Sequence, residues 1–211
     1  MSESIEYRGY TIQIIQDESG ENPITEWDGN VEFCCWHNRY DLGNSERFGN
    51  GLGDIEDCQA YAEETKSILL PLFIYDHSGI ALSLGRNYPF NCQWDSGQLG
   101  YILIDREWMK EYFGNKYFTQ KMRARMLEAA EDGVRLYNQY LSGEVYGYNV
   151  EETGDSCCGF YGYEHRESGL LECAESAIDY DIEDNKKKHF VQLKQWIINK
   201  VPLQYREPLT V

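Results

Sequence analysis

Long apolar runs and a secretion signal are both missing from this sequence. No stretch approaches the eighteen or so consecutive apolar residues that a membrane-spanning helix requires, and Met1–Tyr10 combines two acidic residues with no apolar segment. We therefore expect a cytoplasmic protein that makes no membrane contact. In that compartment the seven cysteines, an odd number, are expected to be reduced thiols.

Cations are scarce. The chain has 19 Lys and Arg against 36 Asp and Glu, a formal net charge of −17. This balance disfavours direct binding to nucleic acid or to anionic membranes, because both need cations to neutralise phosphates. The excess is uneven: residues 1–64 carry −12 and residues 151–184 carry −10, whereas residues 185–211 carry +5. We expect a basic C-terminal helix over residues 184–201 that packs back on the acidic segments.

Signatures of metal and cofactor sites are also missing. The adjacent pairs Cys34-Cys35 and Cys157-Cys158 lack the two-to-four-residue spacing of zinc ligands, and neighbouring strand residues point to opposite faces. The sequence contains no calcium loop, and its Gly-x-Gly pairs lack the strand-to-helix context of a dinucleotide site. We expect no metal and no cofactor.

What the sequence does contain is a large apolar and aromatic fraction, 42% and 14%, which is enough for a packed core. Alternating residues predict hairpins around Arg8-Gly9 and around Asp76–Gly79. Spacings of three and four residues, with capping residues, predict helices over 55–66, 106–113, 119–141, 170–178 and 184–201. The sequence therefore predicts an α+β fold, an antiparallel sheet of hairpins with four to five helices packed on it, as a single domain over residues 1–211.

One cluster of polar residues is a candidate catalytic site. Cys92 or Ser96 would be the nucleophile, His77 its base, and Asp95 or Asp76 would orient the base. The same residue types are also common in turns, where Asp and Ser bond the backbone and Gly adopts positive φ. No nucleophile elbow is present. Further candidates, whose role is left open, belong to this cluster or to a separate polar cluster at residues 155–162: Asp76, Gln93, Trp94, Gln98, Asp155 and Ser156.

The two acidic segments are candidates for partner binding. Carboxylates gathered on one face could occupy the basic groove of a protein that handles nucleic acid, as a mimic of duplex phosphates. A well-solvated surface is the alternative interpretation of such charge runs. The candidate carboxylates are Glu18, Glu21, Glu26, Asp28, Glu172, Glu175, Asp179 and Asp181.

Five motifs give the chain a resemblance to a known group of proteins. They are Ile5–Tyr10 (IEYRGY), Ile74–Ile80 (IYDHSGI), Gln93–Gly100 (QWDSGQLG), Val145–Tyr148 (VYGY) and Asp155–Gly162 (DSCCGFYG). With these motifs the chain resembles a family of small proteins from phage and other mobile elements. Members carry Trp where this chain has Cys158. The resemblance implies a mobile-element origin and no particular activity.

Charge and resemblance together lead to one main hypothesis. The chain is expected to be an acidic phage or mobile-element accessory protein that binds and inhibits a host protein with a basic surface, such as a nucleic-acid-handling defence factor. The contact surface would be the acidic segments and the long Gly-rich loop at 38–53. The alternative is a hydrolase or small-molecule-binding enzyme that uses His77, Cys92, Asp95 and Ser96.

Overall fold

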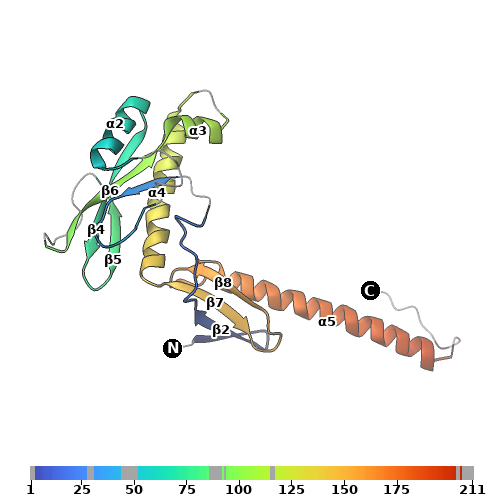
Figure 1. Ribbon diagram of the computed structural model, residues 1–211. Helices are drawn as coiled ribbons and strands as arrows, with labels where there is room; N and C mark the ends of the chain where they lie inside the picture. Colours follow the sequence, from blue (N-terminus) through green and yellow to red (C-terminus); the bar gives the residue numbers. More distant parts are fainter. Residues whose placement is uncertain are drawn as a thin grey trace. The chain divides into compact units, whose positions relative to one another are not determined.

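The computed structural model describes residues 3–27, 31–43, 52–85, 92, 94–114, 117–202 and 205. Within them the predicted α+β class is confirmed, with two four-stranded antiparallel sheets and four helices (Figure 1). Contacts divide the chain into two compact units. Unit 1 comprises residues 1–17 and 146–211, and unit 2, residues 18–145, is inserted between these two segments. The single domain expected from the sequence stays a prediction.

The sheet of unit 1 has the strand order β1-β2-β7-β8, with strands at Glu3–Tyr7, Tyr10–Gln16, Val145–Val150 and Ser156–Tyr161. The β1–β2 hairpin confirms the prediction from alternating residues. Its two turn residues, Arg8 and Gly9, have φ of 51° and 84°, the left-handed backbone that such a two-residue turn needs. The sheet side of the unit 1 core consists of Ile12, Ile14, Tyr148 and Val150.

A single helix, α5 (Leu170–Lys200), packs on this sheet. Leu170, Leu171, Ala174 and Ile178 complete the core. The predicted start of a separate helix near Asp184 is wrong, because the helix continues through it. Asp184 pairs with Lys188 at 2.7 Å and Asn185 donates to Asp181 at 2.9 Å, so these residues make bonds along the helix instead of capping a new one. The second half extends beyond the sheet of its own unit rather than packing back on it (Figure 1).

The sheet of unit 2 has the order β3-β6-β4-β5, with strands at Glu32–Cys35, Ser96–Ile104, Ile68–Asp76 and Ile80–Leu84. Its helices are α2 (Ile55–Thr65), α3 (Arg106–Tyr112) and α4 (Gln120–Leu141). β4 lies inside the sheet although it contains Pro71. A register shift between Leu72 and Phe73 follows the proline, because a proline within a strand is tolerated at a bulge.

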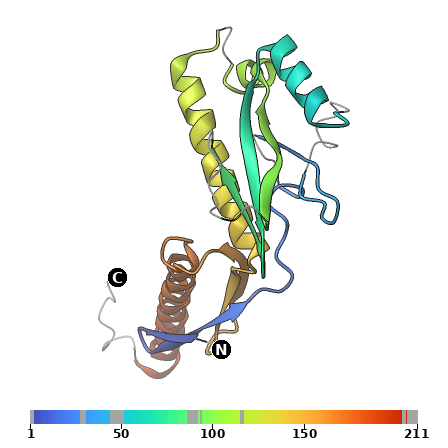
Figure 2. The ribbon, with the colours of Figure 1, turned by 90° about the vertical axis from the view of Figure 1, so that its left-hand side faces the viewer.

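Helices cover both faces of this sheet (Figure 2). On one face, Met122, Met126, Val134 and Tyr137 of α4 pack on strand residues that include Phe33, Leu72, Leu99 and Ile102. On the other face, Cys58 and Ala62 of α2 pack on Cys34, Tyr101 and Leu103. Most of β6, in the middle of the sheet, is therefore buried on both faces.

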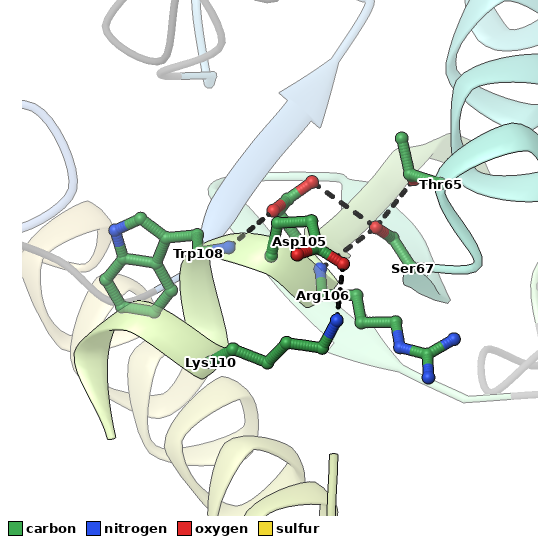
Figure 3. Close-up of polar contacts among 7 residues, drawn as sticks. Thr65, Ser67, Asp105, Arg106, Trp108 and Lys110 are labelled. Carbon is green, nitrogen blue, oxygen red and sulfur yellow. Dashed lines mark hydrogen bonds and ion pairs between the residues drawn. The ribbon is translucent and has the colours of Figure 1, made fainter. Parts of the chain in front are cut away.

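A network around Asp105 joins the ends of several elements (Figure 3). Its carboxylate caps α3 by accepting from the Trp108 amide at 2.8 Å, and it also accepts from the Tyr61 hydroxyl at 3.0 Å. Ser67 accepts from the Arg106 amide at 3.1 Å and donates to Asp105 at 3.4 Å. Burial, together with the hydrogen bond to Asp105, raises the pKa of Tyr61 to about 12.

Candidate functional site

Three segments of unit 2 meet at one end of its sheet. We call this region the polar tip: residues 37–40 after β3, residues 75–79 at the β4–β5 turn, and residues 92 and 94–96 before β6. Tyr75 pairs with Ser96, and the Asp76 amide donates to the carbonyl of Asp95 at 2.7 Å. The turn itself has positive φ at Ser78 and Gly79. The two central motifs of the sequence therefore lie side by side because β4 and β6 are neighbours.

The predicted catalytic residues come together at the polar tip. His77 Nδ1 lies 3.3 Å from Asp95 Oδ2, and Cys92 Sγ donates to the same oxygen at 3.4 Å. The Ser96 hydroxyl donates to the backbone carbonyl of Cys92. Four candidate side chains from two separate motifs thus share one small region.

Their order differs from that of a nucleophilic site. In such a site the base contacts the nucleophile and the carboxylate contacts the base. Here Asp95 lies in the middle and contacts both His77 and Cys92. Reactive thiolates are stabilised by cations or hydrogen-bond donors, whereas the Cys92 thiol faces a carboxylate. The arrangement fits a hydrogen-bonded loop better than a nucleophile with its base.

Aromatic and cationic side chains surround this cluster. Arg39 forms an ion pair with Asp76, and its guanidinium lies 5.5 Å from the ring centre of Tyr40. The His37 ring also stacks on Tyr40, with 5.1 Å between the two ring centres. Trp94 is 95% exposed. Trp, Tyr and Arg are the residues most enriched at protein-binding hot spots.

Arg39 and Tyr40 belong to the loop at 38–53 that the sequence predicted as a contact surface, but they were not predicted to join the catalytic candidates; residues 44–51 of that loop lie outside the described residues. Arg39 is one of only three bases in residues 1–64. The scarcity of cations in so acidic a segment was the signal in the sequence that could have singled it out. Of the remaining motif candidates, Gln98 donates to the carbonyl of Gly100 at 3.3 Å, a bond to its own strand. Gln93 lies outside the described residues.

The motif Asp155–Gly162 belongs to unit 1. The Asp155 carbonyl accepts from the Val150 amide at 2.8 Å, and the Asp155 amide donates to the Thr153 hydroxyl at 3.1 Å. Ser156 begins β8. These contacts are those of the turn between β7 and β8, and Asp155 and Ser156 are not among the residues of the polar tip.

The acidic candidates divide into two groups. Glu18, Glu21, Glu26 and Glu172 are exposed, although Glu21 accepts from the Trp27 indole at 2.9 Å. The rest of the described set makes internal contacts in unit 1: Glu175 with Arg166 at 2.6 Å, Asp179 with Arg8 at 2.9 Å, and Asp181 with the Tyr10 hydroxyl at 2.9 Å. Asp28 lies outside the described residues. Three of the carboxylates that were candidates for partner binding thus make contacts that hold α5 and its preceding turn in place within unit 1.

The described residues contain neither a cluster of metal ligands nor a membrane-spanning helix. Across the described ranges, no group of three or more His, Cys, Asp or Glu side chains could hold a metal ion. Cys34 packs toward α2 and Cys35 toward α4. The two side chains thus point to opposite faces of the sheet, as is expected of adjacent strand residues. Burial raises the pKa of Cys35 well above its usual value. No helix in the described part of the chain is long and apolar enough to cross a membrane.

A groove of ≈ 620 Å³ lies elsewhere in unit 2, between the edge strand β5 and α4. Asn138 of α4 closes the middle of this edge. Its side-chain oxygen accepts from the Leu82 amide at 2.7 Å, and its nitrogen donates to the Leu82 carbonyl at 2.8 Å. The side chain thereby replaces a neighbouring strand, which protects the edge from pairing with another chain.

Comparisons with known proteins add no relative to this description. No protein-family model matches the chain, and neither a curated protein nor a solved structure matches it.

Proposed function

We propose that this chain is an acidic accessory protein of a phage or mobile element that binds and inhibits a host protein with a basic surface, in the class of nucleic-acid-handling defence factors. The net charge of −17 supports a basic protein as partner and disfavours nucleic acid itself. The five sequence motifs support the mobile-element origin. The host cytoplasm is the compartment in which such a partner would be met.

The observation that carries the proposal is Trp94 on the polar tip. Its side chain is 95% exposed, yet its segment is tied to the β4–β5 turn through Asp95 and Asp76. A large aromatic side chain that is presented to solvent on a well-bonded loop loses little conformational entropy when a partner covers it. Arg39, which pairs with Asp76 in the same tip, and Tyr40, which Arg39 contacts, add residues of the same kind.

Charge would then bring the partner to the tip. Glu18, Glu21 and Glu26 are exposed and belong to the same unit as Trp94. Such carboxylates raise the association rate with a basic surface more than the final affinity. The duplex-mimic form of the proposal has less support, because Glu175, Asp179 and Asp181 make contacts inside unit 1.

The test is capture of basic proteins from host extract on the immobilised chain, followed by affinity measurement and an activity assay on the captured protein. Trp94→Ala should weaken binding by about thirtyfold, as loss of a hot-spot residue does. Tyr117→Ala is the matched control, since Tyr117 is 80% exposed in unit 2 but is not part of the tip. Affinity should fall as salt rises, because exposed charges are screened. Binding that resists both salt and Trp94→Ala would refute the proposal.

The convergence of His77, Cys92, Asp95 and Ser96 favours a second candidate, a hydrolase or small-molecule-binding enzyme. Native alkylation separates the two functions. An enzyme with a cysteine nucleophile requires Cys92 to react faster than the exposed thiol of Cys157, and His77→Gln should slow it. Labelling of Cys92 that is slower than that of Cys157 and unaffected by His77→Gln would leave this candidate without a cysteine nucleophile.

A further inference from the structure

The helix α5 has two halves of opposite charge. Residues 170–184 contain six Asp and Glu and no Lys or Arg, whereas residues 185–200 contain five Lys and no Asp or Glu. At 1.5 Å per residue the helix is about 46 Å long. The acidic half packs on the sheet of unit 1, and the basic half extends beyond it (Figure 1).

The basic half also exposes large apolar side chains. Val191 is 64% exposed, Trp196 57% and Ile198 45%. Val191 and Ile198 are seven residues apart and therefore lie on the same side of the helix, whereas Trp196 lies on the other side. The position of these residues on the helix decides what the surface can accommodate.

One seam runs along both halves of α5, away from its buried residues, although its first member still contacts the sheet: Cys173 Sγ lies 3.6 Å from the Tyr148 hydroxyl. Its members follow one another at alternating intervals of four and three residues, the spacing of a coiled coil: Cys173, Ala177, Tyr180, Asp184, Lys187, Val191, Lys194 and Ile198. Ile178 and Ala174, which are buried against the sheet, lie on the other side of the helix. Tyr180 is 74% exposed, so the seam is accessible beside the acidic half as well.

We propose that α5 pairs antiparallel with α5 of a second copy of this chain along that seam. The twofold axis lies between Asn185 and Lys186, where the seam spacing is symmetric. Tyr180 then faces Val191 of the other copy, Cys173 faces Ile198, and Asp184 faces Lys187. Two of these contacts pair apolar residues, Ala177 faces the aliphatic stem of Lys194, and the central pair has opposite charges.

Charge decides between this arrangement and its alternatives. An antiparallel pair places each basic half beside the other copy's acidic half, and residues 1–17 and 146–184 around that half carry −12. A parallel pair would place like charge beside like charge along the whole helix, which is unfavourable. The interface is isologous, so it closes at two copies and does not form a fibre. This inference does not depend on the proposed function.

The first measurement is the mass of the full chain in solution by light scattering over a range of concentrations. We expect twice the chain mass of 24.6 kDa at tens of micromolar and low salt. Raising salt from about 0.05 to 0.5 M should weaken the dimer about tenfold, since the Debye length falls below the spacing of the paired charges. A chain mass that stays at one copy under all these conditions would overturn the proposal, and so would monomers that instead bind vesicles of anionic lipid.

Variants at the centre of the seam test the register. Lys187→Glu places a glutamate opposite Asp184 of the other copy in both of the central contacts. This change should weaken the dimer at least about tenfold. Lys186→Glu is the matched control, because it makes the same charge change on a neighbouring residue outside the seam, and should have less than about a threefold effect. Equal effects of the two would contradict the seam. Circular dichroism verifies that each variant keeps its helix.

A mixing experiment tests the antiparallel direction. Asp184→Lys alone places lysines opposite Lys187 and should also weaken self-association. In a mixture of Lys187→Glu chains with Asp184→Lys chains, both central contacts become attractive in the mixed dimer. We expect neither variant to dimerise well alone and the mixture to recover the dimer. A mixture that remains monomeric while wild type dimerises would refute the antiparallel register.

Discussion

The two units of this protein treat their sheets differently. Unit 2 covers both faces of its sheet, with α4 on one side and α2 on the other, whereas unit 1 has the first half of a single helix on one face. The adjacent cysteines show the consequence. Cys34 is buried and Cys35 half-buried in unit 2, but Cys157 and Cys158 are both exposed in unit 1. The same dipeptide has different surroundings because helices enclose the sheet of unit 2, whereas Cys157 and Cys158 lie in the exposed first part of the edge strand β8.

This difference also separates the regions suited to binding. The enclosed sheet of unit 2 supports a well-bonded tip that presents Trp94. The half-covered sheet of unit 1 needs only part of α5, which leaves the rest of that helix exposed. Each of the following experiments tests whether the two sheets differ in packing as the structure indicates.

The largest effect is expected from Gly100→Ala in the enclosed sheet. A Cβ on Gly100 would lie 2.0 Å from the Cys34 carbonyl oxygen, so β3 and β6 could not keep their pairing. We expect a loss of about 3 kcal/mol or more in the free energy of unfolding of unit 2, measured by urea titration. Gly97→Ala on the same strand, where no atom lies within 4 Å, should stay within about 0.5 kcal/mol of wild type. A small effect at Gly100 would mean that the two strands are less close than described.

The two halves of α5 can be compared by truncating one side chain in each. Ile178→Ala removes a fully buried side chain from the unit 1 core and should cost about 3 kcal/mol. Leu193→Ala, in the exposed half, should cost less than about 0.5 kcal/mol when measured at a protein concentration that keeps the chain monomeric. Equal losses would show that the second half packs on something within its own chain.

The protected edge of unit 2 is tested by Asn138→Ala. This change leaves the amide and carbonyl of Leu82 without their side-chain partners and should cost about 2 kcal/mol. Exposure of an edge strand should also make the variant more prone to aggregate, which light scattering would detect. The control is Arg135→Ala one turn earlier on α4, where only an exposed pair with Asp132 is lost. If both variants behave like wild type, Asn138 does not protect this edge.

The smallest effect concerns Tyr61 and appears only at high pH. Its pKa is raised to about 12 by burial and by Asp105, so the folded protein favours the protonated phenol. The stability from this group is fully present below the ordinary pKa of about 10 and is lost as pH rises through 12. Between pH 8 and 11, wild type should therefore lose more stability than Tyr61→Phe. Parallel losses in the two proteins would contradict the raised pKa.

Local sequence patterns predicted most of the individual elements. Alternating residues and the Arg8-Gly9 turn predicted the β1–β2 hairpin, and Asp54 caps α2 as expected, accepting from the Asp57 amide at 2.8 Å. The α4 helix also begins and ends within a residue or so of its prediction. These features depend on neighbours in the sequence, so their signals are local. The break predicted between helices at 170–178 and 184–201 was wrong because Asp184 and Asn185 resemble cap residues but bond along the helix.

The candidate site depended on pairing between distant segments. The sequence could show that Asp76–Gly79 and Trp94–Gly97 have turn chemistry, but the β4–β6 ladder brings His77, Cys92 and Asp95 together. Only the geometry reveals that Asp95 lies between the other two, which sequence order cannot indicate. Arg39 and Tyr40 join the tip for the same reason, since β3 pairs with the far side of β6.

The sequence by itself determined the α+β class, the charge and most helices and turns, because these follow from composition and from residues a few positions apart. The tertiary structure alone decided that the strands divide into two sheets, that one acidic group serves internal contacts, and that half of α5 remains exposed. The physical reason is that burial depends on which surfaces meet across long sequence separations. Residues with the same local pattern therefore acquire different surroundings, as the two cysteine pairs do.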